Sequence, residues 1–380
     1  MILNEKWEWL NESMAFVLEK IRKNQSKFFD KIPWAASKDL KYPVEENDYW
    51  TASFWIGQLF LVKEYFNSNE FDMVIKKQLE TFDNRLKNKV ELETHDIGFL
   101  YILSAIADYK INGTESSKKM AIDAADALMI RFNEKAGIIQ AWGKLDDLDE
   151  GGRMIIDCLM NLPLLYFATE MTGDDRYRKA ANRHAKQTQK YIVRENATTF
   201  HTYFFDRRTG EGIKGETAQG FSDDSCWARG QAWGIYGFTL SYLYTGDYSY
   251  LETAQLLADY FISQLPSDNV CYWDLVFNDG SHEERDSSAA AIAASGLLEL
   301  AKQLPLSNNR RQQYEEKAVQ IAKSLSQNYI TKDNEEADGL LLHAVYDKNS
   351  NKGVDESVIW GDYFYVETLV RLGREWNKYW

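Results

Sequence analysis

Two aspartates lie in stretches of sequence where a charged residue is unexpected. Asp157 lies within Met154-Ile-Ile-Asp-Cys-Leu-Met-Asn-Leu-Pro-Leu-Leu165, which is otherwise mostly apolar, and Asp96 lies within Thr94-His-Asp-Ile-Gly-Phe-Leu-Tyr101. Because an unpaired charge is costly to bury, the acid in the apolar run is either paired or functional. Asp96 fits a helix N-cap and a site equally well. Two such carboxyl groups could perform general acid and base chemistry.

Arginine, histidine and tryptophan side chains gather near the same parts of the chain. Arg229 lies in Trp227-Ala-Arg-Gly-Gln-Ala-Trp-Gly-Ile-Tyr-Gly-Phe238, and His95 and His201 are the histidines that lie beside such motifs. Five tryptophans are expected at or near one end of the predicted helical fold rather than spread through helix middles: Trp50, Trp142, Trp227, Trp233 and Trp360. Aromatic rings around one mouth would suit the flat, apolar faces of sugars.

Apolar residues recur with the 3.6-residue period of amphipathic helices along most of the chain. This period predicts twelve helices, at 7–22, 50–66, 69–86, 94–111, 115–132, 153–172, 174–192, 227–245, 247–264, 286–303, 308–327 and 358–376. Thr172-Gly-Asp-Asp-Arg-Tyr177 and Thr245-Gly-Asp-Tyr-Ser-Tyr250 are the same turn, in which glycine ends one helix and aspartate caps the next. The helices are therefore predicted to form a repeat of hairpins.

Every second predicted helix is rich in small and apolar residues, yet begins with polar and aromatic side chains. These clusters are Asp48-Tyr-Trp50, His95-Asp96, Arg153 with Asp157, Asp223-Asp-Ser-Cys-Trp-Ala-Arg229, Arg285-Asp286 and Trp360-Gly-Asp362. Six buried helices that are polar at the same end indicate that those ends meet, as they do in an all-α fold of two concentric rings, the (α/α)6 barrel. Their N-termini would then surround one mouth. Asp174, Asp223 and Asp286 are also explained as ordinary N-caps.

The charge and composition exclude several classes of protein. The 380 residues include 58 acidic and 44 basic ones, so the net charge is −14, which argues against nucleic-acid partners and anionic membranes. No apolar stretch is long enough to span a membrane, and the start of the sequence lacks a signal-peptide pattern, so we expect a soluble, cytoplasmic protein. No linker divides residues 1–380, which predicts a single domain.

The remaining histidines and the cysteines carry no predicted chemistry. His184 and His282 are expected at the surface. Cys158, Cys226 and Cys271 lack zinc-ligand spacing and have no basic neighbour that would activate a thiolate. We therefore expect buried, apolar cysteines and no structural metal.

The residues alone favour carbohydrate chemistry by carboxylates at the mouth of a helical barrel. Two other interpretations stay open at this point. An ordinary inverting (α/α)6 glycosidase would have a similar mouth but would cleave saturated oligosaccharides. A non-catalytic helical-repeat protein that binds carbohydrate would have an open concave surface, and would give no reason for Asp157.

Seven segments, in order from about residue 45 to the C-terminus, carry a family resemblance. They are Thr94-His-Asp-Ile-Gly-Phe-Leu-Tyr101, Ala136-Gly-Ile-Ile-Gln-Ala-Trp-Gly143, Gly151-Gly-Arg-Met-Ile-Ile-Asp-Cys-Leu-Met-Asn-Leu-Pro163, Trp227-Ala-Arg-Gly-Gln-Ala-Trp-Gly-Ile-Tyr-Gly-Phe238, Tyr272-Trp-Asp274, Arg285-Asp-Ser-Ser-Ala289 and Ile359-Trp-Gly-Asp-Tyr363. The chain resembles the unsaturated glucuronyl hydrolases, glycoside hydrolase family 88, of the type that acts on chondroitin and hyaluronan disaccharides. The related unsaturated rhamnogalacturonyl hydrolases share the barrel, but their motifs fit less well.

This resemblance implies an (α/α)6 barrel and an uncommon way of cleaving a glycoside. Polysaccharide lyases leave a C4=C5 double bond in the terminal uronate of their products, and the family protonates C4 while water adds at C5. The hemiketal collapses, which releases the unsaturated uronic acid from the non-reducing end of glycosaminoglycan disaccharides. The resemblance implies no metal or organic cofactor. The partner that it implies is the unsaturated uronyl disaccharide. We expect no nucleic acid and no membrane, as the charge indicates, and a weak homo-oligomer stays open.

The resemblance also assigns roles to individual residues. Asp157 corresponds to the general acid and base, and Asp96 to a second essential acid that binds the ring hydroxyls. Gln219 and Arg229 correspond to polar contacts around the substrate. The expected pocket lining is His95, His201, Trp50, Trp142, Trp233 and Tyr346. We expect Arg229, the two histidines and the helix N-termini to offset the charge of an anionic sugar.

Sulfate recognition is only half represented in the sequence. Family members that prefer sulfated fragments resemble one another in having a basic residue two positions after the glutamine, where this chain has Phe221. They also have a hydroxyl residue, then serine, then lysine in a loop before the last helix. Ser350 and Lys352 fit that pattern, but Asp347 occupies the first position. Sulfate tolerance therefore stays open.

Overall fold

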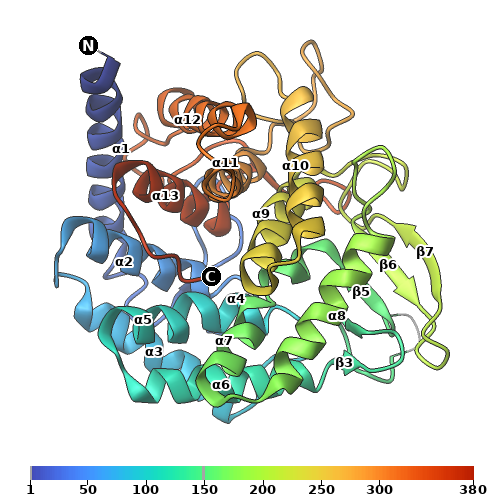
Figure 1. Ribbon diagram of the computed structural model, residues 1–380. Coiled ribbons are helices and arrows are strands. Elements are labelled where there is room, and N and C mark those ends of the chain that lie inside the picture. Colours follow the sequence, from blue (N-terminus) through green and yellow to red (C-terminus); the bar gives the residue numbers. More distant parts are fainter. Residues whose placement is uncertain (1, 148–149) are drawn as a thin grey trace.

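Alternate helices of the chain differ sharply in burial. In the computed structural model, which describes residues 2–147 and 150–380, α9 (Ala228–Thr245) and α11 (Ser287–Lys302) bury most of their residues on every side. In contrast, α8 (Asp175–Tyr191) and α12 (Asn309–Asn328) bury one face only. Small side chains in α11 allow neighbouring helices to approach it closely. The difference separates an inner ring of helices from an outer ring (Figure 1).

The inner ring closes on itself. Its members are α2 (Ser53–Phe66); α4 (Ile97–Tyr101) continued by the π-helical η1 (Ile102–Ile106) and α5 (Ala107–Asn112); the 3-10 helix η2 (Ile156–Met160) with α7 (Pro163–Thr172); α9; α11; and α13 (Ile359–Gly373). Each contacts the next, and α13 contacts α2. The outer ring is α1 (Ile2–Asn24), α3 (Asp72–Lys87), α6 (Glu115–Met129), α8, α10 (Tyr248–Ser263) and α12. The predicted (α/α)6 barrel is confirmed.

Connections at the two ends of the barrel differ in length. Each inner helix except α13, which is the last element, leads to the next outer one through a short turn. Gly173 and Gly246 adopt the predicted left-handed conformation in two of these turns, with φ of 75° and 70°. Asp174 and Asp247 cap the following helices through the backbone N–H groups of Arg176 and Ser249. The turns predicted from the two Thr-Gly-Asp motifs are confirmed.

Longer connections run from outer to inner helices, and they contain nearly all the strand pairing. The strands are β1 (Ile32–Pro33) with β2 (Val44–Glu45), β3 (Phe132–Asn133) with β4 (Ile138–Ile139), the sheet β5 (Arg153–Ile155), β6 (Thr202–Phe205) and β7 (Gly212–Glu216), and β8 (Ala344–Asp347) with β9 (Lys352–Glu356). All pairs are antiparallel. These connections lie where the inner helices begin, so they surround the mouth.

One predicted helix begins differently from the expectation. The segment 153–172 starts as strand β5, whose Arg153 is paired with Phe204, and continues as η2 before α7 begins at Pro163. Proline is favoured in the first helical turn because its missing N–H has no partner there in any case. The prediction of one continuous helix is wrong for residues 153–162, because pairing with β6 determines this part of the chain.

The C-terminal residues cover the end of the barrel opposite the mouth. The C-terminus lies inside the ring of helices in Figure 1. Trp380 is 1% exposed; its ring stacks on Phe364 with a centroid distance of 5.8 Å, and its Nε1 donates to Glu367 Oε2 at 2.8 Å. Arg371 forms ion pairs with Glu299 and Glu367 beside it. None of the described helices is long and apolar enough to cross a membrane.

Candidate active site

Two segments from different inner helices bring the acids Asp96 and Asp157 together. Asp96 precedes α4, and Asp157 lies in η2. The segments touch at Gly98, where an added Cβ would lie 2.3 Å from Cα of Asn161. The side chain of Asn161 strengthens the contact, because its Oδ1 accepts a hydrogen bond from the Phe99 N–H at 2.6 Å. A residue larger than glycine would therefore push the two acids apart.

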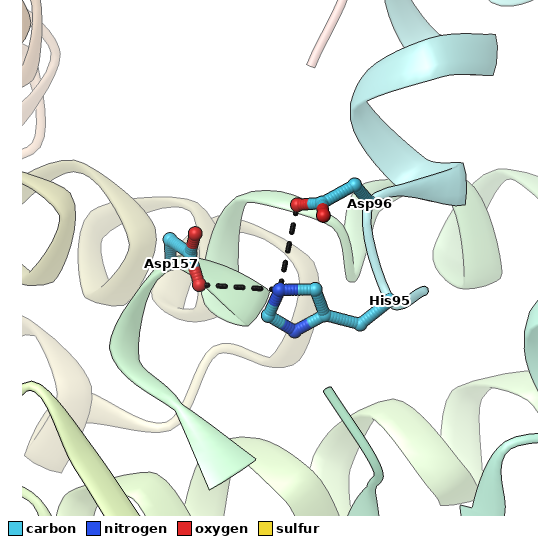
Figure 2. A group of neighbouring side chains, drawn as sticks. All are labelled: His95, Asp96 and Asp157. Atoms are coloured by element: carbon cyan, nitrogen blue, oxygen red, sulfur yellow. Dashed lines mark ion pairs between the residues drawn. The ribbon is translucent and has the colours of Figure 1, made fainter. Parts of the chain in front are cut away.

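His95 lies between the two carboxylates (Figure 2). Its Nε2 is 3.4 Å from Asp96 Oδ1 and 3.4 Å from Asp157 Oδ1, and its side chain is fully buried. Neither ring nitrogen of His95 has a hydrogen-bond partner among the described residues. Burial, with a smaller contribution from Arg131, lowers its pKa to about 3. The imidazole is therefore neutral at ordinary pH.

The environment raises the pKa of both acids. Burial raises the pKa of Asp157 well above its usual range, and the neighbouring Asp96 raises it further. Burial also raises the pKa of Asp96, to about 6, although the hydrogen bond from Thr94 Oγ1 to its Oδ2 at 2.5 Å acts in the opposite direction. Asp96 makes no N-cap hydrogen bond. Asp157 thus holds a proton near neutral pH while Asp96 is mostly ionised.

The two acids border a cavity of about 380 Å³ at the mouth of the barrel. Predicted residues that line it are Asp157, Asp96, Gln219, Arg229, Trp233, His201, Trp50, Trp142 and Tyr346. Of the other predicted residues, His95 is buried and contacts both acids, as described above. Ser350 is exposed in the turn between β8 and β9. Lys352 lies beside the cavity, where its Nζ donates to Tyr49 Oη at 3.2 Å.

Arg229 is anchored at the start of α9. Its guanidinium is 2% exposed, pairs with Asp286 at 3.1 Å, and donates to Gln219 Oε1 at 2.6 Å and to the Tyr346 carbonyl at 2.7 Å. Asp286 is also the predicted N-cap of α11, since it accepts hydrogen bonds from the backbone N–H groups of Ser288 and Ala289. Asp286 therefore links the start of α11 to the buried guanidinium that contacts Gln219.

His201 orients the loop that carries Gln219. Its Nδ1 accepts hydrogen bonds from the backbone N–H groups of Ala218 and Gln219 at 3.0 and 3.1 Å, so the ring is neutral with its proton on Nε2. Burial and the neighbouring Arg229 hold its pKa well below the usual range. The expectation that His95 and His201 offset the charge of an anionic ligand is wrong, because neither ring is protonated.

Several sequence expectations near the mouth need correction. Asp362 does not line the cavity; it accepts hydrogen bonds from Tyr42 Oη and the Leu341 N–H, and burial raises its pKa to about 7. Asp223 accepts a hydrogen bond from the Thr217 N–H rather than capping α9. His184 is not at the surface but fully buried on the inward face of α8, where its Nδ1 accepts a hydrogen bond from the Ile139 N–H at 2.9 Å.

The cavity also includes Trp227, one of the tryptophans expected near the mouth. The other lining residues, to which no individual role was assigned, are Asp48, Tyr49, Arg85, Glu91, Glu93 and Thr94. Asp48, Glu91 and Glu93 are exposed, so they mark the rim, and their carboxylates take part in no ion pair with the described residues. Arg85 is committed to backbone oxygens, including those of Tyr49 and Glu91. Asp48, Tyr49 and Thr94 belong to the motifs Asp48-Tyr-Trp50 and Thr94-His-Asp, and Glu91 and Glu93 precede the second one. Arg85 has no such signal in the sequence.

The family of the chain follows from comparison with known proteins. The sequence profile described as Glycosyl Hydrolase Family 88 matches residues 20–373. This chain belongs to that family. It is 43% identical to the unsaturated chondroitin disaccharide hydrolase of Streptococcus pneumoniae (strain ATCC BAA-255 / R6) over 373 residues, which cover 98% of this chain and 94% of the relative.

Solved structures of family 88 members are equally similar. The unsaturated glucuronyl hydrolase from Streptococcus agalactiae has a TM-score of 0.95 and 43% identity, over 98% of this chain and 94% of that one. A mutant of that enzyme in complex with dGlcA-GalNAc6S has a TM-score of 0.87 and 40% identity, over 98% and 93% of the two chains. Family 88 membership makes this protein a glycoside hydrolase, so the interpretation as a non-catalytic binding protein is wrong.

Proposed function

We propose that this family 88 protein releases the unsaturated uronic acid from the non-reducing end of glycosaminoglycan disaccharides made by lyases. Chondroitin- and hyaluronan-derived disaccharides are its substrates. The observation that carries the proposal is the pair of acids beside the cavity, of which Asp157 keeps its proton near neutral pH. The names of the relatives and the disaccharide bound to the S. agalactiae mutant support the substrate class.

In the proposed reaction, Asp157 acts as the general acid. Its proton passes to C4 of the enol ether, and the positive charge that develops at C5 is captured by water. The Asp157 carboxylate takes a proton from that water, which restores the acid. The C5 hemiketal then collapses into a 4-deoxy-5-keto uronate and the released sugar. Ionised Asp96 accepts hydrogen bonds from the ring hydroxyls, and Gln219 and Arg229 contact the polar groups of the uronate.

Loss of ultraviolet absorbance tests the proposal directly. The conjugated double bond of unsaturated uronyl disaccharides absorbs near the ultraviolet edge, and turnover removes it. We expect the absorbance of chondroitin and hyaluronan disaccharides to disappear, while a saturated analogue stays intact. Unchanged absorbance with chondroitin, hyaluronan and heparin disaccharides would refute the activity. Cleavage of the saturated analogue would instead indicate an ordinary inverting glycosidase, and selective turnover of an unsaturated rhamnogalacturonan disaccharide would indicate the related family.

Isotope labelling separates hydration at C5 from ordinary glycoside hydrolysis. Hydrolysis in heavy-oxygen water should place the label on the uronate product, because the water adds to C5. The bond from C1 to the glycosidic oxygen breaks only when the hemiketal at C5 collapses. The released sugar should carry none. Label in the released sugar would refute the mechanism even where the absorbance falls.

The same panel tests sulfate preference. Lys352 Nζ lies 4.5 Å from the ring centre of Tyr346, which lines the cavity, so this ammonium is close to the mouth. Phe221 is 57% exposed and supplies no positive charge. Each disaccharide should therefore be assayed separately from its 6-sulfated form. The ratio of the two kcat/KM values measures the preference of the enzyme for the sulfated substrate.

Location, assembly and domain organisation are part of the proposal. The three cysteines are free and buried, which suits a reducing compartment such as the cytoplasm. We expect residues 1–380 to form one domain, because the inner ring closes between α13 and α2. Cell fractionation would test the location. Light scattering would test whether the protein forms a weak homo-oligomer, and a single cooperative unfolding transition would support the single domain.

A further inference from the structure

The three side chains in Figure 2 have the spacing of metal ligands as well as of an acid pair. His95 Nε2 is 3.4 Å from one carboxylate oxygen of Asp96 and 3.4 Å from one of Asp157. Ligand atoms at about 2.1 Å from a tetrahedral zinc ion lie about 3.4 Å from one another. The two carboxylate oxygens lie within 4.8 Å of each other, and the group is the only set of three such ligands found among the described residues.

Two of these ligand atoms are buried without a hydrogen-bond partner in the described chain. His95 Nε2 and Asp157 Oδ1 accept or donate no hydrogen bond within the described chain, and His95 is fully buried and directed toward both acids. A buried polar atom without a hydrogen-bond partner lowers the stability of the fold, and a ligand that binds the atom restores part of that stability. A neutral imidazole with two carboxylates is a donor set that suits zinc, and the adjoining cavity leaves room for water as a further ligand.

We propose that His95, Asp96 and Asp157 bind a divalent ion of the zinc type, and that the bound ion inhibits the enzyme. The ion would occupy the carboxylates on which the proposed function depends and would replace the proton on Asp157. His95 Nδ1 has no partner in the described chain to orient the ring, whereas histidines in resident metal sites nearly always have one. The ion therefore exchanges with solution and is removed by chelators, which separates it from a structural or catalytic cofactor.

Calorimetric titration of metal-free protein with zinc chloride tests the binding. We expect one site in the wild type, a loss of affinity of at least tenfold in His95→Gln and in Asp157→Asn, and no loss in His343→Ala. The last variant is the matched control, because His343 forms an exposed pair with Asp355 at 2.6 Å. Circular dichroism establishes that each variant is folded. Equal affinity in folded wild type and Asp157→Asn would overturn the proposal, as would loss of the site in His343→Ala alone.

The inhibition rests on the proposed function, whereas the binding does not. If the disaccharides are substrates, zinc should raise their apparent KM, and addition of a chelator should restore the rate. Zinc that binds equally well in the presence of saturating disaccharide would overturn the inhibition. If no disaccharide is turned over, the proposed function fails and the calorimetry still decides whether the site exists. Cobalt supplies a second readout, since a four-coordinate ion of this type absorbs visible light strongly and His95→Gln should remove that absorbance.

Discussion

The side chain of Asp157 combines burial with a neighbouring negative charge. Both effects favour its protonated form, which is the form that a general acid requires. We predict that Asp157→Asn reduces kcat by at least about 100-fold, because the amide keeps the shape but has no acidic proton. The melting temperature should hardly change. Asp174→Asn, at an exposed helix cap, is the control and should retain full activity. More than a few per cent activity in Asp157→Asn would remove this residue from the acid role.

The dependence of activity on pH follows from the two coupled acids. As the pH falls through about 6, Asp96 gains a proton and loses its charge, so kcat/KM should fall. As the pH rises through the higher pKa of Asp157, the acid loses its proton and kcat/KM should fall again. Removing the charge of Asp96 lowers the pKa of Asp157, so Asp96→Asn should move the alkaline limb to lower pH. An alkaline limb that moves to higher pH would contradict the coupling.

At the scale of residues, the sequence predicts those functional groups that stand out from their surroundings. Asp157 is noticed because acids are rare in apolar runs, and Arg229 because its helix is otherwise buried. Glu91 and Glu93 line the cavity but were not predicted, because exposed acids in a loop are ordinary in sequence. The burial of His184 depends on an N–H group of Ile139, which is 45 residues away, and no local pattern reports it.

At the scale of elements, the spacing of the two acids depends on the contact between α4 and η2. We predict that Gly98→Ala lowers kcat by tenfold or more, because its Cβ would displace Asn161 and move Asp96 away from Asp157. The alkaline limb of its pH profile should also shift. Gly57→Ala is the matched control, since that Cβ meets the ring of Tyr363 at 2.7 Å on another inner helix. The control should lose stability but keep the wild-type pH profile; equal shifts in both variants would contradict a positioning role.

The helices could be predicted because their period is local, whereas the strands around the mouth could not. All twelve predicted helical segments contain a helix, and the left-handed glycines end two of them as expected. In contrast, β5 exists because Arg153 pairs with Phe204, about 50 residues later in the chain. A strand of three residues has too few positions to establish an alternating pattern. The loops that complete the site were therefore the least predictable part of the fold.

At the scale of the whole molecule, Trp380 fills the end of the barrel opposite the mouth. Its ring lies 5.9 Å from that of Phe99, and Phe99 lies 5.4 Å from Trp233, which lines the cavity. Trp380→Ala should lower the free energy of unfolding by about 3–5 kcal/mol, because it leaves a cavity and removes the donor to Glu367. Chemical denaturation measures this change, and Leu306→Ala, at an 87% exposed position, should have almost no effect. A change below about 1 kcal/mol in Trp380→Ala would contradict the closing role.

The net charge of −14 affects how an anionic substrate approaches the mouth. Both histidines of the site are neutral, both cavity arginines are bonded to the protein, and Asp48, Glu91 and Glu93 are exposed at the rim. Asp286 neutralises Arg229, and the three rim carboxylates outnumber the charges of Arg85 and Lys352 beside the cavity, so we expect the field at the entrance to repel a uronate. Salt screens this field over a length of about 10 Å at 0.1 M. We predict that kcat/KM rises a fewfold between low and moderate salt, mainly through KM. Glu93→Gln should raise kcat/KM at low salt and flatten this dependence, whereas Glu252→Gln, on the exposed side of α10, should not. A kcat/KM that falls with salt would mean that the entrance attracts anions, and that Arg229 outweighs the carboxylates of the rim.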